Sequence, residues 1–142
     1  MKSLKQLLDE KAGPMAVVSP QDTVLHALTV MAAHNVGAVM VMDGEHLIGI
    51  FSERDYARKV ILCGKSSREL PVREVMSERV IFVTLANTIE ECMALMTDKH
   101  IRHLPVIDDG RLIGIVSIGD LVKEIISSQR FIISELERYI SG

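Results

Sequence analysis

The 142-residue sequence contains no tryptophan, and aromatic residues make up only 4% of it. Proteins that bind single-stranded nucleic acids usually present aromatic stacking platforms, and nucleic-acid binding in general usually shows a basic stripe. Here 16 basic residues are scattered among 19 acidic ones, and the formal net charge is −3. We therefore expect no nucleic-acid partner.

Long apolar runs are also missing, although 48% of the residues are hydrophobic. A helix that spans a bilayer needs about 20 consecutive apolar residues, and no run has that length. The first residues, MKSLKQLLDEKAG, carry acidic side chains where a signal peptide would have its apolar segment. The sequence therefore predicts a cytoplasmic protein without a membrane partner.

The sequence has two cysteines, Cys63 and Cys92, which do not form a CxxC motif. Both lie within apolar helical patterns, so we expect buried free thiols rather than a disulfide or a metal site. His100 and His103 have a spacing that metal ligands can use, but no third ligand of a suitable type stands near them in the sequence. We therefore predict no metal site.

What the chain does contain is an internal repeat. Residues 18–56 align without a gap to residues 83–121, and the most similar segments read HLIGIFSERD at 46–55 and RLIGIVSIGD at 111–120. Solenoids normally need at least three stacked units to be stable. Two copies therefore predict a closed pair that shares one interior and is related by a pseudo-twofold axis.

Each copy shows the same predicted order of elements: strand, helix, strand, strand, helix. The helical segments have apolar residues at helical spacing, and turn residues separate the last two strands. Asn87 and Glu90 have the spacing of a capping box at the start of the helix in the second copy. The predicted strands are 16–18, 38–42 and 47–51 in the first copy, and 80–83, 104–107 and 112–116 in the second.

These elements divide the chain into five predicted segments. They are an N-terminal helix at 1–13, the first repeat at 14–63, a linker at 64–79, the second repeat at 80–127 and a C-terminal helix at 128–142. Near its end the chain is apolar on nearly continuous helical faces, at Ile125, Ile126, Phe131, Ile132, Ile133, Leu136 and Ile140. Such a helix needs a partner in its own domain or in a second subunit, and we favour a homodimer.

The repeated segment combines a glycine, a serine and an aspartate at three-residue intervals. Glycine inside a strand usually marks the close approach of another backbone or of a ligand. A serine at the following helix start suits a phosphate, and an aspartate in the first turn can accept hydrogen bonds from both ribose hydroxyls. Ser-x-x-Asp at a helix start is equally an ordinary capping box, so both interpretations stay open. The residues are Gly49, Ser52 and Asp55 in the first copy and Gly114, Ser117 and Asp120 in the second.

The two copies differ in charge beside this motif. Arg54 lies in the first helical turn of the first copy, where a cation opposes the helix dipole unless an anion is near. The second copy has Ile118 and Gly119 instead. We therefore expect Arg102 and His103 to supply the positive charge for a ligand at the second copy.

With these motifs the sequence resembles a tandem pair of CBS domains, the Bateman module, over about residues 15–127. The resemblance rests on Gly-h-h-Ser-x-x-Asp in both copies and on Arg102-His103-Leu104-Pro105-Val106. It implies an α/β fold of two pseudo-twofold-related βαββα repeats that pack through their sheets, and assembly into flat dimeric discs. It also implies an adenosyl ligand bound between the repeats, with AMP favoured over ATP or ADP, NAD and S-adenosylmethionine.

The resemblance further implies which residues contact the ligand. Ribose would lie on Asp55 and Asp120, and phosphate near Ser52 and Ser117 with the adjoining helix starts. The remaining implied nucleotide-binding residues are Thr23, Val36, Gly37, Ile50, Glu53 and Arg54 in the first copy and Thr88, Arg102, His103, Ile115 and Gly119 in the second.

Three classes of function are compatible with this pattern to different degrees. The favoured class is a non-catalytic, energy-sensing regulatory module that acts through a homodimer or a separate effector protein. The alternative is a structural dimerisation module in which the serine and aspartate only cap helices. An enzyme ranks last, because the sequence offers no nucleophile or acid paired with a base.

Overall fold

The computed structural model describes residues 1–11 and 13–141. Ala12 and Gly142, which belong to the predicted terminal segments 1–13 and 128–142, lie outside the described residues. The chain divides into two compact units. The first-repeat unit comprises residues 14–81 and 109–112, and the second-repeat unit comprises residues 1–13, 82–108 and 113–142.

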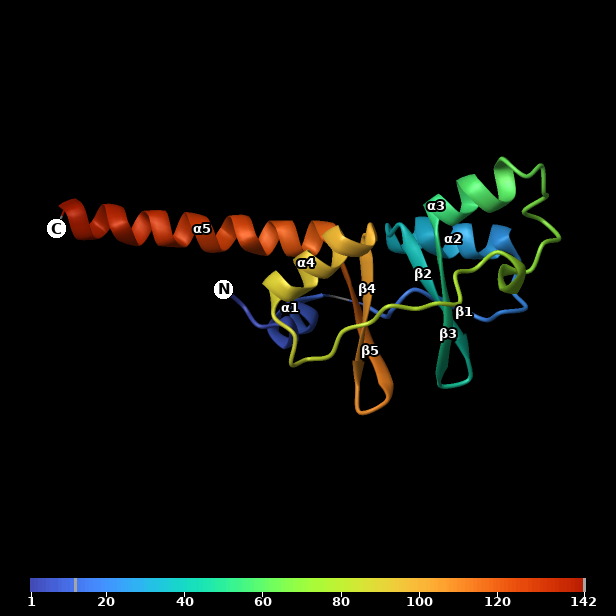
Figure 1. The fold of residues 1–142 in the computed structure, drawn as a ribbon, viewed down its shortest axis with the longest axis horizontal. Coiled ribbons are helices and arrows are strands. Elements are labelled where there is room, and N and C mark those ends of the chain that lie inside the picture. Colours follow the sequence, from blue (N-terminus) through green and yellow to red (C-terminus); the bar gives the residue numbers. More distant parts are fainter. Residues whose placement is uncertain (12, 142) are drawn as a thin grey trace. The chain divides into compact units, whose positions relative to one another are not determined.

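The first-repeat unit is built on a three-stranded sheet with the order β1-β2-β3 (Figure 1). β1 is parallel to β2, and β2 is antiparallel to β3 with Ala38 opposite Ser52. The elements are β1 (Val17–Val18), α2 (Val24–His34), β2 (Ala38–Asp43), β3 (His46–Ser52), α3 (Glu53–Asp55), a π-helix (Tyr56–Ile61) and a 3₁₀-helix (Val72–Glu74).

Helix α2 shows how local sequence signals and burial combine in this unit. Thr23 caps the helix because its side chain accepts a hydrogen bond from the backbone N–H of His26 at 3.1 Å. The buried side chains Val24, Ala27 and Met31 recur at helical spacing and pack into the core of the sheet. The apolar pattern therefore fixes which face of α2 covers the sheet.

The predicted linker, residues 64–79, packs onto the first-repeat unit. Its helical piece after Pro71 is the 3₁₀-helix, and Val72, Val75 and Met76 are buried in the core of the unit. Ser77 then pairs with Ile50 of β3 through two backbone hydrogen bonds of 2.8 and 3.0 Å. The segment thus lies along the edge of the strand that carries the repeated motif.

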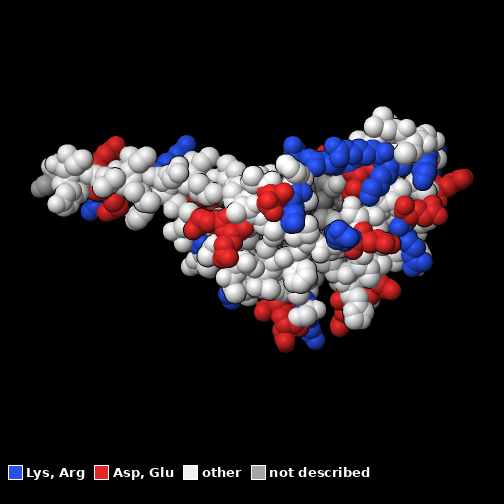
Figure 2. All heavy atoms as spheres, in the orientation of Figure 1, with Lys and Arg blue, Asp and Glu red and all other residues white. Residues whose placement is uncertain are grey.

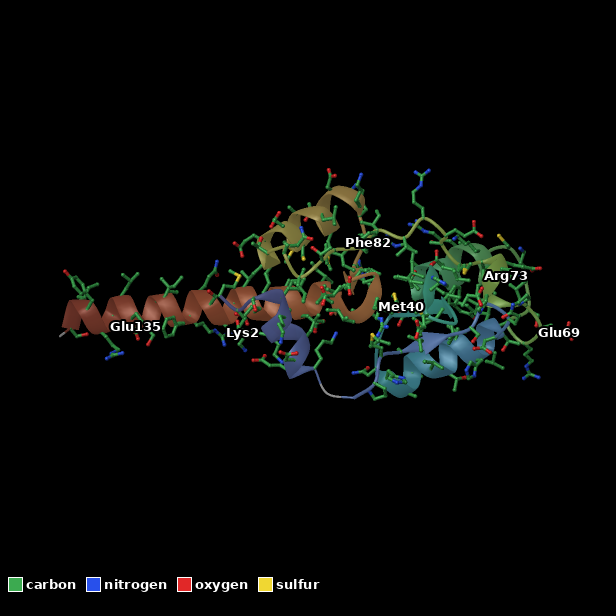
Figure 3. The ribbon with its side chains drawn as sticks, turned by 90° about the horizontal axis from the view of Figure 1, so that it is seen from below. Lys2, Met40, Glu69, Arg73, Phe82 and Glu135 are labelled. Carbon is green, nitrogen blue, oxygen red and sulfur yellow. The ribbon has the colours of Figure 1, made fainter. Side chains whose placement is uncertain are left out.

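The second-repeat unit contains three of the four described α-helices that are longer than one turn. Two of them lie on either side of a hairpin, and the third is the N-terminal helix. Its elements are α1 (Leu4–Glu10), α4 (Ile89–Lys99), β4 (His103–Asp108), β5 (Arg111–Ser117) from Ile113 onward and α5 (Ile118–Ser141), with β4 and β5 forming a two-stranded sheet. In Figure 3 Lys2 lies beside α5, where its backbone N–H donates to Oε1 of the buried Glu124 at 3.0 Å. This bond ties the start of the N-terminal helix to α5.

Two expectations for the second repeat are wrong. The strand predicted at 80–83 is reduced to one parallel bridge between Val83 and Val106, because Val80 donates to the Glu78 carbonyl in a tight turn and a new turn begins at Thr84. The capping box does not join Asn87 to Glu90. It is formed by Thr88 and Glu91.

Asn87 has a different role, because its side-chain oxygen accepts a hydrogen bond from the backbone N–H of Thr84 at 2.9 Å. Asp22 does the same for Ser19 in the first repeat at 2.8 Å. In both repeats a turn closed by this side-chain bond to the residue three positions earlier therefore precedes the helix, and the threonine that follows it is the cap.

The cysteines divide into one confirmed and one wrong prediction. Cys92 is buried in α4, as its apolar pattern indicated. Cys63 is exposed, because the helical pattern ends at Ile61 and the chain turns through Gly64, whose φ of +67° is typical of glycine at a chain reversal. Both are free thiols.

Helix α5 is 24 residues long and has two different halves. Leu121 and Glu124 are buried near its start, whereas every described residue from Gln129 onward is exposed. Within the part of the chain that the structure describes, no helix combines the length and apolar character needed to cross a membrane. The predicted α/β class with two repeats and added terminal helices is confirmed.

Candidate functional site

The repeated motif of the first copy forms a reciprocal capping box at the junction of β3 and α3. Ser52 Oγ accepts a hydrogen bond from the Asp55 backbone N–H at 3.2 Å, and Asp55 Oδ2 accepts one from the Ser52 backbone N–H at 3.0 Å. The Ser52 hydroxyl also donates to Asp55 Oδ2 at 3.1 Å. The capping interpretation of this motif is therefore realised in the structure.

The second carboxylate oxygen of Asp55 contacts residues outside the motif. Lys59 Nζ lies 3.2 Å from Oδ1, and the Ser77 hydroxyl donates to the same oxygen at 3.2 Å. Lys59 comes from the π-helix one turn later and also donates to the Val75 carbonyl at 3.1 Å. We call Ser52, Asp55, Lys59 and Ser77 the Asp55 cluster; its carboxylate is only 13% exposed.

The second copy repeats the capping box at the junction of β5 and α5. Asp120 Oδ2 accepts a hydrogen bond from the Ser117 backbone N–H at 2.9 Å, and Ser117 Oγ accepts one from the Asp120 backbone N–H at 3.1 Å. Lys11 Nζ, which follows helix α1, lies 2.8 Å from Asp120 Oδ2 and 2.7 Å from the Ile115 carbonyl. Ser117, Asp120 and Lys11 form the Asp120 cluster.

The electrostatics of the Asp120 cluster favour the charged carboxylate. Burial raises the pKa of Asp120, but hydrogen bonds from Lys11 and Ser117 and the positive charge of Lys11 lower it by more. The pKa of Asp120 therefore lies below its ordinary value of 3.8. An ionised carboxylate with a lysine beside it is the state of this cluster at neutral pH.

Each glycine of the motif allows a side chain to pack directly on the strand. A Cβ atom on Gly49 would lie 2.5 Å from Met76 Sδ and 3.2 Å from the Ser77 carbonyl oxygen. A Cβ atom on Gly114 would lie 2.6 Å from Leu8 Cδ2. Both glycines therefore mark a close approach, but the prediction of a backbone or a ligand holds only in part: Ser77 brings a backbone oxygen to Gly49, whereas only the Leu8 side chain approaches Gly114.

The backbone before the second strand of each repeat reaches the same helix start. The Gly37 carbonyl accepts a hydrogen bond from the Glu53 N–H at 3.0 Å, and the Arg102 carbonyl accepts one from the Ile118 N–H at 2.8 Å. Two groups that lie far apart in sequence are thus joined in each unit. The structure brings Gly37 to the Asp55 cluster and Arg102 to the Asp120 cluster.

The two threonines lie elsewhere. Thr23 and Thr88 are the N-caps of α2 and α4, and Val36 and Gly37 follow the opposite end of α2. An 11-residue helix separates those ends by about 16 Å. Thr23 is therefore not part of the Asp55 cluster, and Thr88 likewise stands at the far end of α4 from Arg102.

The remaining candidate residues differ in accessibility. Ile50, Ile115, Val36 and His103 are partly buried, and the exposed candidates are Glu53, Arg54, Arg102 and Gly119. Among residues 1–11 and 13–141 there is no group of three or more His, Cys, Asp and Glu placed to hold a metal ion. The partly buried Ile50 and Ile115 retain some exposed surface.

Sequence reasoning missed the partners of the two aspartates. Lys11 lies outside the repeat and Ser77 lies in the predicted linker, so neither belongs to the aligned motif. Lys59 lies four residues after Asp55, which is the spacing of a helical ion pair, so this partner could have been predicted from the sequence. The lysine at Asp120 adds a cation where only Arg102 and His103 were expected to provide one.

Comparison with known proteins places the chain in a family. The model of the CBS domain matches residues 11–61 and 72–127. Over 126 residues the chain is 46% identical to the CBS domain-containing protein CBSX3, mitochondrial, of Arabidopsis thaliana, a match that covers 85% of this chain and 61% of that protein. The chain thus spans less than two thirds of the length of that relative.

Solved structures give the same result. The crystal structure of the CBS domain NE2398 is 49% identical, with a TM-score of 0.83, and the match covers 88% of this chain and 98% of that one. The CBS domain pair of MJ0100, in complex with 5′-methylthioadenosine and S-adenosyl-L-methionine, shares the fold at 22% identity with a TM-score of 0.76, over 87% of this chain and 99% of that one. The chain belongs to the CBS domain family and carries two copies of the domain.

Proposed function

We propose that the protein is a non-catalytic regulatory module that binds an adenine nucleotide, with AMP favoured over ATP or ADP, NAD and S-adenosylmethionine. The proposal is supported by the adenosyl ligands in the MJ0100 complex and by the CBS domain family itself. Binding would shift the arrangement of a homodimer or of an effector protein that senses energy status. Cytoplasmic localisation remains part of the proposal, whereas the CBSX3 relative is mitochondrial.

The observation that carries the proposal is that a lysine lies beside the aspartate of both motifs, although the two lysines come from different parts of the chain. Each unit holds a serine, an ionisable aspartate and a lysine ammonium at the first turn of a helix. The lysine comes from the helix itself in one unit and from the segment after α1 in the other. A cap needs no lysine, but a phosphate beside a helix N-terminus is stabilised by one.

The geometry suggests how a nucleotide would use these groups. Both carboxylates accept hydrogen bonds that ribose hydroxyls can replace, from Lys59 and Ser77 at Asp55 and from Lys11 at Asp120. In our proposal the ribose takes the place of the lysine on the carboxylate. The released ammonium group then pairs with the phosphate, so that the charge of each cluster stays balanced.

One observation favours the alternative, a structural dimerisation module without a physiological ligand. Both capping boxes are complete, and each aspartate already has an ammonium partner within the chain. In that case the clusters stabilise helix starts and no exchange with ribose takes place. Binding measurements separate the two functions, because a ligand that binds only the folded state must raise the melting temperature.

The test is a thermal-shift and calorimetric titration of the full chain with AMP, ATP, NAD and S-adenosylmethionine. Asp55→Ala and Asp120→Ala are each expected to weaken binding of the active ligand, by unequal factors because the two clusters differ. Asp98→Ala, at an exposed position of α4, serves as the matched control. A melting temperature that no ligand changes would favour the structural module, and equal affinity in all three variants would remove the ribose assignment.

Absence of catalysis is tested separately. The purified chain is incubated with each nucleotide, and the products are followed by chromatography. We expect the nucleotides to be recovered unchanged, because in each cluster the carboxylate and the lysine ammonium group are paired with each other. Steady turnover that Asp55→Ala or Asp120→Ala abolishes would replace the regulatory proposal with an enzymatic one.

A further inference from the structure

The second half of α5 exposes a continuous apolar surface. This part of the helix extends past α1 and α4 of its own unit, and the labelled Glu135 lies on it (Figures 1 and 3). Tyr139 is 86% exposed and Ile140 82% exposed. The other large apolar side chains exposed along this half are Phe131, Ile132, Ile133 and Leu136.

A helix in this situation gains little stability from its own unit. Isolated helices of about 15 residues are marginal in water, and most helices in proteins are stabilised by packing an apolar face. Residues from Gln129 onward are exposed throughout the described part of α5. Figure 2 shows this half as mainly uncharged surface with scattered charges of both signs. The face therefore requires a covering partner.

The spacing of the apolar residues indicates what kind of partner fits. The positions that line the face alternate in steps of three and four residues, which is the heptad spacing of helix pairs. The face consists of the apolar residues Ile126, Ile133, Leu136 and Ile140 and the polar Gln129. Ile132 and Tyr139 flank it on one side. Phe131 lies on the opposite side of the helix. A second helix with the same spacing complements this face, and a second copy of the chain supplies one.

The charges beside the face indicate the orientation of that second helix. Arg130 and Glu137 lie seven residues apart along one edge of the face. In an antiparallel pair centred between Ile133 and Ser134, Arg130 of each copy faces Glu137 of the other, which gives two ion pairs. A parallel pair gives neither, because it places Ile125 beside Arg130 and Ile132 beside Glu137.

The length of the exposed segment agrees with the same register. An antiparallel pair centred at this point overlaps residues 126–141 of both copies, about 22 Å of helix. Burial of α5 by its own unit includes Leu121 and Glu124 and does not continue beyond Ser128. The end of one helix therefore reaches the place where the other helix begins to be covered by its own unit.

We propose that residues 126–141 of α5 form an antiparallel two-helix interface with the same segment of a second copy. The inference deepens the homodimer in the proposed function by naming its surface and rests on that part alone. Ile133 of each copy packs against Leu136 of the other, with the Arg130 and Glu137 pairs along one edge. An interface of this size is at the small end of the range for dimers, so association is reversible and depends on concentration.

The first test is sedimentation velocity of the full chain over a range of concentrations. Leu136→Asp and Ile133→Asp are each expected to weaken self-association by about tenfold or more, because a charge enters the apolar interface. Phe131→Asp is the matched control, since it introduces the same charge on the same helix outside the face. All three side chains are exposed, so circular dichroism and melting temperature should show an intact fold.

The second test concerns orientation. Arg130→Glu and Glu137→Arg are each expected to weaken the homodimer, because two ion pairs become two repulsions. An equimolar mixture of the two variants is expected to form a heterodimer with about the native affinity, since one ion pair keeps its native residues and the other is restored with the signs exchanged. A mixture no stronger than the separate variants would overturn the antiparallel register.

Other results would overturn the interface itself. These are a monomer at all concentrations, or a dimer that Leu136→Asp leaves unchanged. Flotation of the native chain with phosphatidylcholine vesicles, lost in Leu136→Asp, would assign the face to a lipid surface instead. Nucleotide binding is measured on the Leu136→Asp chain in parallel, so failure of the interface and failure of ligand binding give different results.

Discussion

The ammonium group of Lys11 lies 2.8 Å from the carboxylate of Asp120, although the two residues are 109 positions apart in the chain. The same ammonium group donates to the Ile115 carbonyl at 2.7 Å, so it joins the end of β5 to the first turn of α5. At the first repeat Lys59, which comes from the local helix, pairs with the Asp55 oxygen that does not accept the cap hydrogen bond. Each of the two repeated motifs thus has a lysine beside its aspartate, but the two lysines come from different parts of the sequence.

Removal of the Lys11 ammonium group should change ligand affinity at the second motif. If the ribose replaces Lys11 on Asp120, Lys11→Met has two effects. It removes the group that competes with the ribose for the carboxylate, and it removes the cation that would pair with the phosphate. We expect the second loss to dominate for AMP, with about three- to tenfold weaker binding, and binding of adenosine, which has no phosphate, to become stronger. Isothermal titration with both ligands measures the two effects.

Lys5→Met is the control for that experiment. Lys5 lies on the same N-terminal helix and forms an exposed pair with Asp9 at 3.1 Å. The Lys5→Met variant should bind AMP and adenosine with unchanged affinities. Equal weakening of AMP and adenosine by Lys11→Met would show that the lysine only supports the fold.

The lowered pKa of Asp120 predicts a specific dependence of stability on pH. Because the pKa of the folded state lies below the ordinary value of 3.8, the stabilisation from this group is fully present above that value. It is lost as the pH falls through the pKa of the folded state. Lys11→Met removes contributions that lower the pKa of Asp120, so the stability difference between native and variant chains should be largest at neutral pH and shrink as the pH falls through the ordinary value of 3.8.

Urea unfolding of both chains across this range measures that difference, and the remaining carboxylates titrate alike in the two proteins. A difference in the free energy of unfolding that stays constant down to about pH 3 would contradict the ion pair.

The motif glycines should tolerate alanine to different degrees. Gly49→Ala forces Met76 to move and brings a methyl group to 3.2 Å from the Ser77 backbone oxygen, so we expect a loss of about 1–3 kcal/mol. At Gly114 the Cβ would meet the end of the flexible Leu8 side chain, and a loss of about 1 kcal/mol or less is expected.

Gly119→Ala provides the reference for this series, because its Cβ would lie at an ordinary 3.6 Å from Ser117 Oγ in the first turn of α5. We expect a neutral or slightly stabilising effect, since alanine favours helix. Equilibrium unfolding in urea ranks the three variants. A loss for Gly114→Ala as large as that for Gly49→Ala would mean that Leu8 cannot move aside.

The two thiols should react at very different rates. Cys63 is exposed, whereas Cys92 is buried in α4 and burial raises the pKa of its thiol. A thiol reagent such as Ellman's reagent at neutral pH is expected to modify Cys63 rapidly and Cys92 only after unfolding. Cys63→Ser should remove the rapid phase. A rapid phase that persists in this variant would show that α4 opens in the folded state.

Much of the fold follows from local signals in the sequence. The hairpins were predictable because β-rich apolar runs flank the turn residues Asp43-Gly44 and Asp108-Asp109-Gly110, and Gly44, Asp109 and Gly110 do adopt positive φ. The helix starts were predictable because Ser-x-x-Asp and a threonine cap satisfy their first N–H groups locally. The strand at 80–83 was not, because strand pairing depends on a distant partner and Val83 alone finds one.

The candidate site divides in the same way. The sequence by itself determined that Ser52 with Asp55 and Ser117 with Asp120 stand at two helix starts, because their hydrogen bonds span only three residues. Only the tertiary structure decided that Ser77 and Lys11 approach those carboxylates and that Met76 and Leu8 cover the glycines. These contacts form where separate segments pack on one strand, and the local sequence pattern does not indicate which distant segment packs there.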